Sequence, residues 1–281
     1  MNKKTEKEKL IPHPDQQFKK LQYKLSETEH RYGSRYHILA DPFLLSHLAK
    51  LCAKDTTQPL INELVTTIYS SLLKIVVNQE FSCVQRELNT RMSEMHPEGV
   101  YQGPMIDSEV PVVSVNLARA GTLPSHICYT ALNYFMNPLK VRQDHISIGR
   151  TTNEQEKVTG SKVSGHKIGG SIDRSIVLFP DPMGATGGTL VEALDLFKSR
   201  GKAHKYIALH CIVTPEYLKR VKEAHPDLLV YAVRLDRGLS SKEVLDSVPG
   251  TFWEKERGLN DKHYIVPGGG GFGEVMNNAY V

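Results

Sequence analysis

An aspartate followed closely by a glycine-rich run is the part of this sequence best suited to chemistry. Asp181 is separated from the apolar segment 176–179 by one proline, and the glycine-rich segment 184–188 follows it. Exposed N–H groups in such a turn, with the positive end of a helix dipole behind them, favour an anion such as a phosphate. The carboxylate of Asp181 would repel that phosphate, so we expect it to contact sugar hydroxyls or a magnesium ion shared with the ligand. The pattern predicts a ribose 5-phosphate held at both ends; the alternative is a strand-to-helix turn that uses glycine only for its geometry.

The elements around this loop have the order strand, turn, helix. Residues 176–179 predict a buried strand that ends near Pro180, which cannot donate to a sheet. Thr189 and Glu192 fit a capping box for the following helix. That helix is predicted from apolar residues at helical spacing, Leu190, Leu194 and Phe197. The loop lacks the Lys-Ser/Thr of a triphosphate-binding P-loop, which excludes that class of site.

The motif from Asp181 to Thr189 resembles the phosphoribosyl pyrophosphate (PRPP) signature of type I phosphoribosyltransferases. Its Asp-Pro-Met opening resembles the uracil phosphoribosyltransferases, although Gly184 stands where that family usually has Leu. The resemblance implies a catalytic Asp181 that holds the ribose hydroxyls, and Mg²⁺ bound together with PRPP. It also implies that the whole motif contacts PRPP, through Asp181, Pro182, Met183, Gly184, Ala185, Thr186, Gly187, Gly188 and Thr189.

A second loop follows another strand candidate, Val112 to Val115. There Arg119 is followed by Gly121, which permits a sharp turn. An isolated arginine is by default a surface ion-pair partner, but Arg-Ala-Gly after a strand resembles the family's pyrophosphate loop. The resemblance implies that Arg119 binds PRPP and is catalytic, because a guanidinium stabilises the charge of the leaving pyrophosphate.

The segment 149–170 is long, polar and dotted with glycine. It is either an inert excursion or a lid, and loops of this length are more often functional. It lies where the resembling family has a mobile loop, with Arg150 at the position of an arginine that contacts PRPP. Lys167 precedes Asp181 by fourteen residues, as a family lysine does.

The C-terminal segment 258–268 resembles the family's uracil-recognition segment, which implies uracil binding by Ile265, Gly270, Gly271 and Phe272. The family continues Leu-Gly-Asp-Ala-Gly-Asp, whereas this chain has Gly271 in place of the first acid and Phe272 in place of the alanine. These two changes predict weaker base binding, because one charged hydrogen-bond partner is lost and one ring is added. The same residues match GxGxxG, but too little chain follows them to form a βαβ dinucleotide site.

The remaining pattern predicts an α/β fold with a parallel sheet flanked by helices, like a type I phosphoribosyltransferase. Helical spacing runs from His37 to about Glu80, with Phe43, Leu44, His47, Leu48 and Leu51 on one face of its first helix. After Val110, short strand candidates alternate with helices. We expect N-terminal helices, a C-terminal base-binding hood, and ligands at the carboxyl ends of the strands.

The chain divides into a polar N-terminal extension, 1–35, and a phosphoribosyltransferase domain, 36–281. An insertion at about 239–257 splits one family element and contains the only tryptophan, Trp253. Ser240 and Glu243 are predicted to cap a short helix there, with Val244, Leu245 and Val248 facing inward. The insertion is read as a surface elaboration or subunit contact, and the alternative is a shield over the base site.

Composition sets the class of protein. With 35 basic and 31 acidic residues the net charge is +4, which gives no reason to expect nucleic acid as a partner. No apolar run is read as long enough for a membrane span, and the charged N-terminus does not resemble a signal peptide. Cys128 and Cys211 lie in apolar runs, so the four cysteines are expected to be free thiols in a cytoplasmic protein.

The function implied by the resemblance is the conversion of uracil and PRPP to UMP and pyrophosphate. An alternative of another class is a weak or inactive homologue that binds PRPP or a nucleotide as a regulatory protein, and a third is a transferase for a different base. The resemblance further implies GTP binding and a homodimer or higher oligomer.

Overall fold

The computed structural model describes residues 22–152 and 158–280, with the backbone alone at residues 150–152 and 158–162. The N-terminal extension predicted for residues 1–35 therefore lies largely outside the described residues.

An eight-stranded sheet forms the centre of the molecule. All of its neighbouring strands are parallel except the pair β5–β6. The order is β1 (Tyr36–Ile38), β10 (Leu229–Leu235), β9 (Lys205–Val213), β7 (Ile176–Pro180), β4 (Val112–Ala118), β5 (Val141–Thr152) and β6 (Val158–Lys167), while the two-residue β8 (Met183–Gly184) also pairs with β9. This arrangement confirms the predicted parallel sheet.

Helices cover both faces of the sheet, and alternate residues of the central strand separate the two layers. Ile176 and Leu178 belong to a core shared with helices α2 (Pro42–Leu51), α3 (Leu60–Glu80) and α4 (Thr122–Leu132). Val177 and Phe179 belong to the opposite core, shared with α5 (Gly188–Lys198) and α6 (Pro215–Ala224). A strand buried on both faces is apolar throughout, which is why the segment 176–179 reads as an uninterrupted run.

Helix α3 corrects the expectation that no segment is long enough to span a membrane. Among the described residues it is the one helix that meets the length and hydropathy criteria, and half of its apolar window is buried inside the protein. Its buried positions are almost all Leu, Ile or Val, whereas Thr66, Ser70 and Lys74 lie on its exposed side. This is the pattern of a core helix, whose apolar face is broad enough to pass the same test.

Two details of the predicted N-terminal helices are wrong. Residues Tyr36–Ile38 form the edge strand β1 rather than a helix, because they pair in parallel with residues Val230 to Ala232 of β10. Phe43 does not share the buried face of α2, since it is 55% exposed while Leu44, Leu48 and Leu51 are buried.

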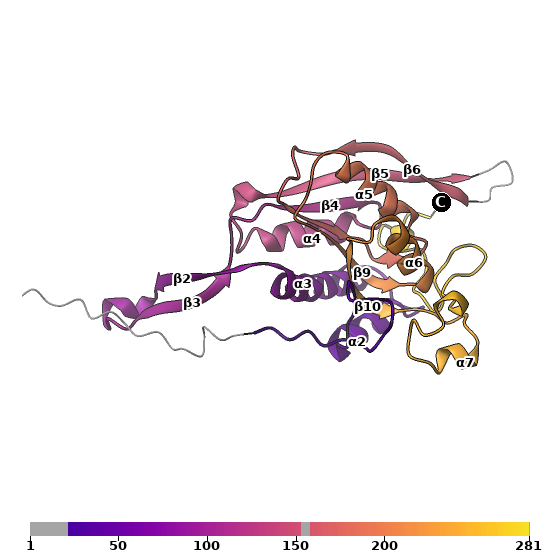
Figure 1. The fold of residues 1–281 in the computed structure, drawn as a ribbon, viewed down its shortest axis with the longest axis horizontal. Coiled ribbons are helices and arrows are strands. Elements are labelled where there is room, and N and C mark those ends of the chain that lie inside the picture. Colours follow the sequence, from indigo (N-terminus) through magenta and orange to yellow (C-terminus); the bar gives the residue numbers. More distant parts are fainter. Residues whose placement is uncertain (1–21, 153–157, 281) are drawn as a thin grey trace, which may run out of the picture.

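Two hairpins were not predicted. Strands β2 (Cys83–Asn89) and β3 (Val100–Ile106) pair outside the main sheet, with the 3₁₀ helix η1 (Arg91–Glu94) at their turn, and project away from the molecule (Figure 1). The segment 149–170, predicted as a long loop, continues β5 and returns as β6 in antiparallel pairing. A hairpin without a continuous buried face has no strict alternation of apolar and polar residues, so neither hairpin is visible in the sequence.

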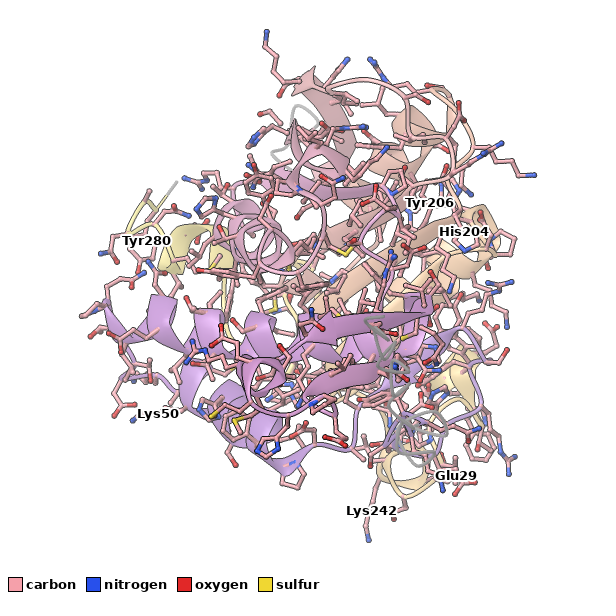
Figure 2. The ribbon with its side chains drawn as sticks, turned by 90° about the vertical axis from the view of Figure 1, so that its left-hand side faces the viewer. Glu29, Lys50, His204, Tyr206, Lys242 and Tyr280 are labelled. Carbon is pink, nitrogen blue, oxygen red and sulfur yellow. The ribbon has the colours of Figure 1, made fainter. Side chains whose placement is uncertain are left out.

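The insertion at 239–257 lies against α6 and the segment around Tyr32. It contains α7 (Lys242–Leu245) and η3 (Trp253–Lys255), and in Figure 2 Glu29 and Lys242 lie on the same lower side of the molecule. The Glu256 carboxylate accepts from the Tyr32 hydroxyl and from Arg237 at 2.9 Å. The short helix has Ser241 at its N-cap rather than a Ser240–Glu243 capping pair, and Leu245 is 42% exposed although it was predicted to face inward.

The last elements lie at the side of the molecule opposite the β2–β3 hairpin (Figure 1). They are the tail helix α8 (Phe272–Val275) and the described C-terminal residues. The remaining 3₁₀ helix, η2 (Pro138–Lys140), leads into β5.

Candidate functional site

The predicted site residues lie at the carboxyl ends of two adjacent parallel strands. Strand β7 ends at Pro180, directly before Asp181, and strand β4 ends at Ala118, directly before Arg119. A Cβ on Gly121 would lie 3.1 Å from the Pro180 carbonyl oxygen and 2.8 Å from that of Leu117. Glycine is therefore needed for close approach of the two loops, which the sheet brings together as predicted.

The Asp181 loop is fixed by its backbone to strand β9. The amide of Asp181 donates to the Leu209 carbonyl at 3.0 Å, and the Pro182 carbonyl accepts from the amides of Cys211 and Ile212. The Gly184 carbonyl accepts from the amide of Thr214 at 3.1 Å. Because these carbonyls point toward β9, the loop is held from behind and its other side is left to a ligand.

The Asp181 side chain is closely surrounded by protein. Although it is partly accessible to solvent, dense surrounding protein raises its pKa to about 7, and the N–H of Met183 donates to it and lowers the pKa to a smaller extent. A carboxylate that is poorly solvated gains most from hydroxyl donors or a cation. A sugar diol or a ligand-bound metal ion would supply such a partner, and contact of Asp181 with either one stays a prediction.

Helix α5 starts directly behind this loop. Its N-cap is Gly187, at φ 78°, a left-handed conformation that favours glycine. The predicted Thr189–Glu192 capping box is wrong, because the helix already begins at Gly188 and its N-cap makes no side-chain hydrogen bond. The first-turn amides of a helix lack intrahelical acceptors, and on an eleven-residue helix they form a place for a phosphate.

The Arg119 loop starts with a cis peptide bond between Ala118 and Arg119. Behind it, the buried Asn116 lies 3.0 Å from His145 Nδ1 and accepts from the Thr122 hydroxyl, which ties the loop to α4. The Arg119 guanidinium donates to the Ala279 carbonyl at 3.2 Å. The arginine therefore lies between the end of β4 and the C-terminal tail.

The tail is anchored before it reaches the site. Arg234 and Asp236 form a salt bridge at 2.6 Å, and this pair holds Gly268 by both its amide and its carbonyl. A Cβ on Gly269 would lie 2.7 Å from Cys52 Sγ, so the tail also passes tightly against the end of α2. These contacts fix the glycine-rich segment above the ends of the strands.

The two departures in the tail have structural counterparts. Phe272 is only 3% exposed and packs into the core shared with α2 and α3. A Cβ on Gly271 would lie 2.7 Å from Glu274 Oε2, so the Glu274 carboxylate occupies the space next to the residue that lacks an acid. The Phe272 ring thus points into the protein, and its predicted effect on base binding stays a prediction.

The structure does not place the two cations predicted in the segment 149–170, Arg150 and Lys167, next to Asp181. The backbone of Arg150 pairs with Ser161 on the β5–β6 hairpin, and its side chain lies outside the described part of the structure. Lys167 is exposed on the edge strand β6, which is separated from β7 by β4 and β5. The sheet therefore does not bring Lys167 next to Asp181.

Three groups around the site were missed: the Asn116–His145 contact, the Arg234–Asp236 clamp, and the pair His210 and Tyr217 behind Asp181. The sequence contains a signal for the Arg234–Asp236 clamp and for His210. Arg234 and Asp236 alternate at the end of a strand and so share one side of it, and His210 is a lone polar residue in the apolar run 207–213.

The residues present suit a metal ion that arrives with a ligand. Among the residues that the structure describes there is no group of three His, Cys, Asp or Glu side chains that would hold one. One carboxylate next to a phosphate site is nevertheless the usual protein contribution to Mg²⁺ that is bound mainly by substrate oxygens and water.

Comparison with known proteins gives a consistent result. The family model described as uracil phosphoribosyltransferase matches residues 38–252. The chain is 29% identical over 243 residues to uracil phosphoribosyltransferase from Streptococcus mutans, covering 86% of this chain and 97% of that protein. It is 28% identical over 241 residues to the protein of the same name from Dictyoglomus turgidum, covering 85% and 97%. A solved structure of a protein from Aquifex aeolicus has the same fold, with a TM-score of 0.67 at 22% identity over 88% of this chain and 99% of that one.

Proposed function

The chain belongs to the uracil phosphoribosyltransferase family, and from that premise we propose that it transfers a phosphoribosyl group from PRPP to uracil. The products are UMP and pyrophosphate. The observation that carries the proposal is the convergence of three segments: the Asp181 loop, the Arg119 loop and the anchored tail.

Each segment supplies one part of the reaction. The Asp181 carboxylate accepts from the ribose hydroxyls, and residues Ala185 to Thr189 hold the 5-phosphate at the start of α5. Arg119 and Arg150 bind the pyrophosphate, which gains negative charge as its bond to the sugar breaks. Uracil attacks the same sugar carbon from the side of the tail, so catalysis consists of positioning and charge stabilisation without a covalent nucleophile.

The tail supports an active enzyme rather than an inactive homologue. With Phe272 in the core, the backbone of Ile265, Gly270 and Gly271 stays available for the base. Glu274 stands where the family has its second acid, and its carboxylate lies next to Gly271, so a negative charge is retained beside that position. The two changes that raised the inactive alternative are thus accommodated by neighbouring residues.

The proposal also covers the metal ion, the oligomeric state and the cellular location of the protein. Asp181, together with oxygens of PRPP, would hold a Mg²⁺ ion, which would neutralise part of the phosphate charge. A homodimer or higher oligomer is supported by the projecting β2–β3 hairpin, which exposes Leu88, Met92, Met95 and Met105. A cytoplasmic location is supported by the four free cysteines. GTP binding stays a prediction of the resemblance.

The test is incubation of purified protein with labelled uracil, PRPP and Mg²⁺, with chromatographic detection of UMP. UMP formation that disappears in Asp181→Asn is the expected result. PRPP binding by calorimetry without turnover would instead favour a regulatory homologue, and turnover with another base alone would favour a different transferase. If turnover is absent, Gly271→Asp combined with Glu274→Ala tests whether the tail is responsible.

A further inference from the structure

Two polar side chains are completely enclosed behind the Asp181 loop. His210 on β9 has no exposed surface, and Tyr217 on α6 is 1% exposed. His210 Nδ1 lies 2.6 Å from the Asp181 carbonyl oxygen, and His210 Nε2 lies 2.6 Å from the Tyr217 hydroxyl. Burial of two such groups is unfavourable unless both are hydrogen-bonded, and here each satisfies the other.

The direction of these hydrogen bonds follows from their acceptors. A carbonyl oxygen only accepts, so Nδ1 of His210 carries the proton and donates to Asp181. The other ring nitrogen then accepts from the hydroxyl of Tyr217. Burial lowers the pKa of His210 to about 4, so the ring stays neutral and this one arrangement persists at neutral pH.

The ring of Tyr217 fills the space beside the glycines of the same loop. A Cβ on Gly184 would lie 3.2 Å from this ring and 2.9 Å from Val213 Cγ1. A Cβ on Gly187 would lie 3.5 Å from the ring. A leucine at position 184, as the resembling family usually has, does not fit while Tyr217 occupies this space.

Helix α6 is joined to the loop by a further contact. Thr214, its N-cap, is fully buried and donates from its hydroxyl to the Ala185 carbonyl at 2.7 Å. The same hydroxyl accepts from the amide of Tyr217 at 3.0 Å. Thr214 therefore fixes the position of Tyr217 as well as that of Ala185. A shift of α6 would displace the Asp181 loop at both contacts.

We propose that Tyr217 and His210 act as positioning residues for PRPP binding: the Tyr217 ring takes the place of a side chain at Gly184, and its hydroxyl, through His210, fixes the main chain of Asp181. This inference rests on the proposed function for the identity of the ligand. Neither side chain touches the substrate. Their effect is to hold Asp181 and the phosphate-binding amides at the spacing of one ribose 5-phosphate.

The first experiment removes the hydrogen bonds and keeps the packing. Tyr217→Phe retains the ring but leaves His210 without its donor, and His210→Leu removes both hydrogen bonds. We expect the KM for PRPP to rise roughly five- to tenfold in each, with the KM for uracil unchanged. His210→Gln keeps a donor and an acceptor and should recover most of the PRPP affinity. The matched control is Tyr206→Phe at the other end of β9 (Tyr206 is labelled in Figure 2), which should leave both KM values unchanged.

The second experiment exchanges the two side chains. Gly184→Leu alone should weaken PRPP binding more than tenfold, because its Cβ meets Val213 and Tyr217. Gly184→Leu combined with Tyr217→Ala should bind PRPP more tightly than the product of the two single effects predicts. Circular dichroism and thermal melts of every variant show whether a loss of binding reflects loss of folding.

The outcomes separate the two levels of inference. If the unaltered protein binds no PRPP in calorimetry with Mg²⁺, the proposed function fails. If it binds PRPP and Tyr217→Phe and His210→Leu bind it equally well, the positioning role is wrong although the function stands. Independent, multiplicative effects of the exchange at 184 and 217 would equally overturn the packing part of the proposal.

Discussion

Replacement of Asp181 by asparagine should make the ligand-free protein more stable at alkaline pH while it abolishes activity. Burial raises the pKa of this carboxyl from 3.8 to about 7, so the folded state binds its proton more tightly than the unfolded chain does. The stability that this proton contributes is fully present below pH 3.8 and is lost as the pH rises through about 7. Asparagine has nearly the same shape and carries no charge, so the free energy of unfolding of Asp181→Asn does not fall in this way as the pH rises.

The magnitude follows from the two pKa values. Their difference corresponds to about 4 kcal/mol once the carboxyl is fully ionised, and partial solvent access reduces the expected value to about 2–4 kcal/mol. Between pH 5 and pH 8 the stability advantage of Asp181→Asn should therefore grow by about 1.5–3 kcal/mol. The site thus maintains an unfavourable charge that its ligand relieves, which is common where function and stability conflict.

Urea denaturation of both proteins at pH 5, 6, 7 and 8, without ligand, measures this difference directly. The matched control is Asp55→Asn, the same substitution at an exposed aspartate outside the Asp181 loop, the Arg119 loop and the tail. A constant difference between Asp181→Asn and the unaltered protein across this range would refute the reasoning, since it would show that Asp181 titrates alike in the folded and unfolded chains.

Three further outcomes follow from the geometry. Arg119→Lys should lower kcat/KM for PRPP by about 10- to 100-fold and weaken product inhibition by pyrophosphate, because a lysine does not bind two phosphate oxygens side by side. Glu274→Gln should lower kcat/KM for uracil about tenfold or more with little change in PRPP affinity, and an unchanged value would show that the Glu274 carboxylate has no part in uracil binding. Gly121→Ala should weaken PRPP binding in calorimetry and lower the melting temperature, because its Cβ would meet backbone atoms of Leu117 and Pro180 within about 3 Å.

The central part of the fold is visible in the sequence because its signals are local. An apolar strand such as 176–179, followed by a glycine-rich turn and a helix, specifies its own conformation. Parallel pairing then places Asp181 and Arg119 at the same edge of the sheet, whatever the rest of the chain does. The positions of these two loops therefore follow from pattern and topology together.

The parts that the sequence did not reveal depend on distant partners. The β2–β3 hairpin has a single buried residue, Gly103, in its two strands and thus no buried face to create a pattern. Tyr32 reads as part of a polar extension, yet it is fully buried against Trp253 and Glu256, more than 200 residues away. His210 and Tyr217 are seven residues apart on different elements, and only the turn between β9 and α6 brings their side chains together.

A departure from a family motif is therefore informative only together with the residues packed against it. Gly184 alone suggests a looser phosphate loop, but the ring of Tyr217 fills the adjoining space. Gly271 alone suggests a lost acid, but the carboxylate of Glu274 lies next to it. At Gly184 the volume is supplied by a residue of another element, and at Gly271 the adjoining space holds the acid that the family motif also has at position 274. If this reasoning is right, restoring only the family residue, as in Gly184→Leu or in Gly271→Asp with Glu274 retained, will impair the protein, because the space is already occupied.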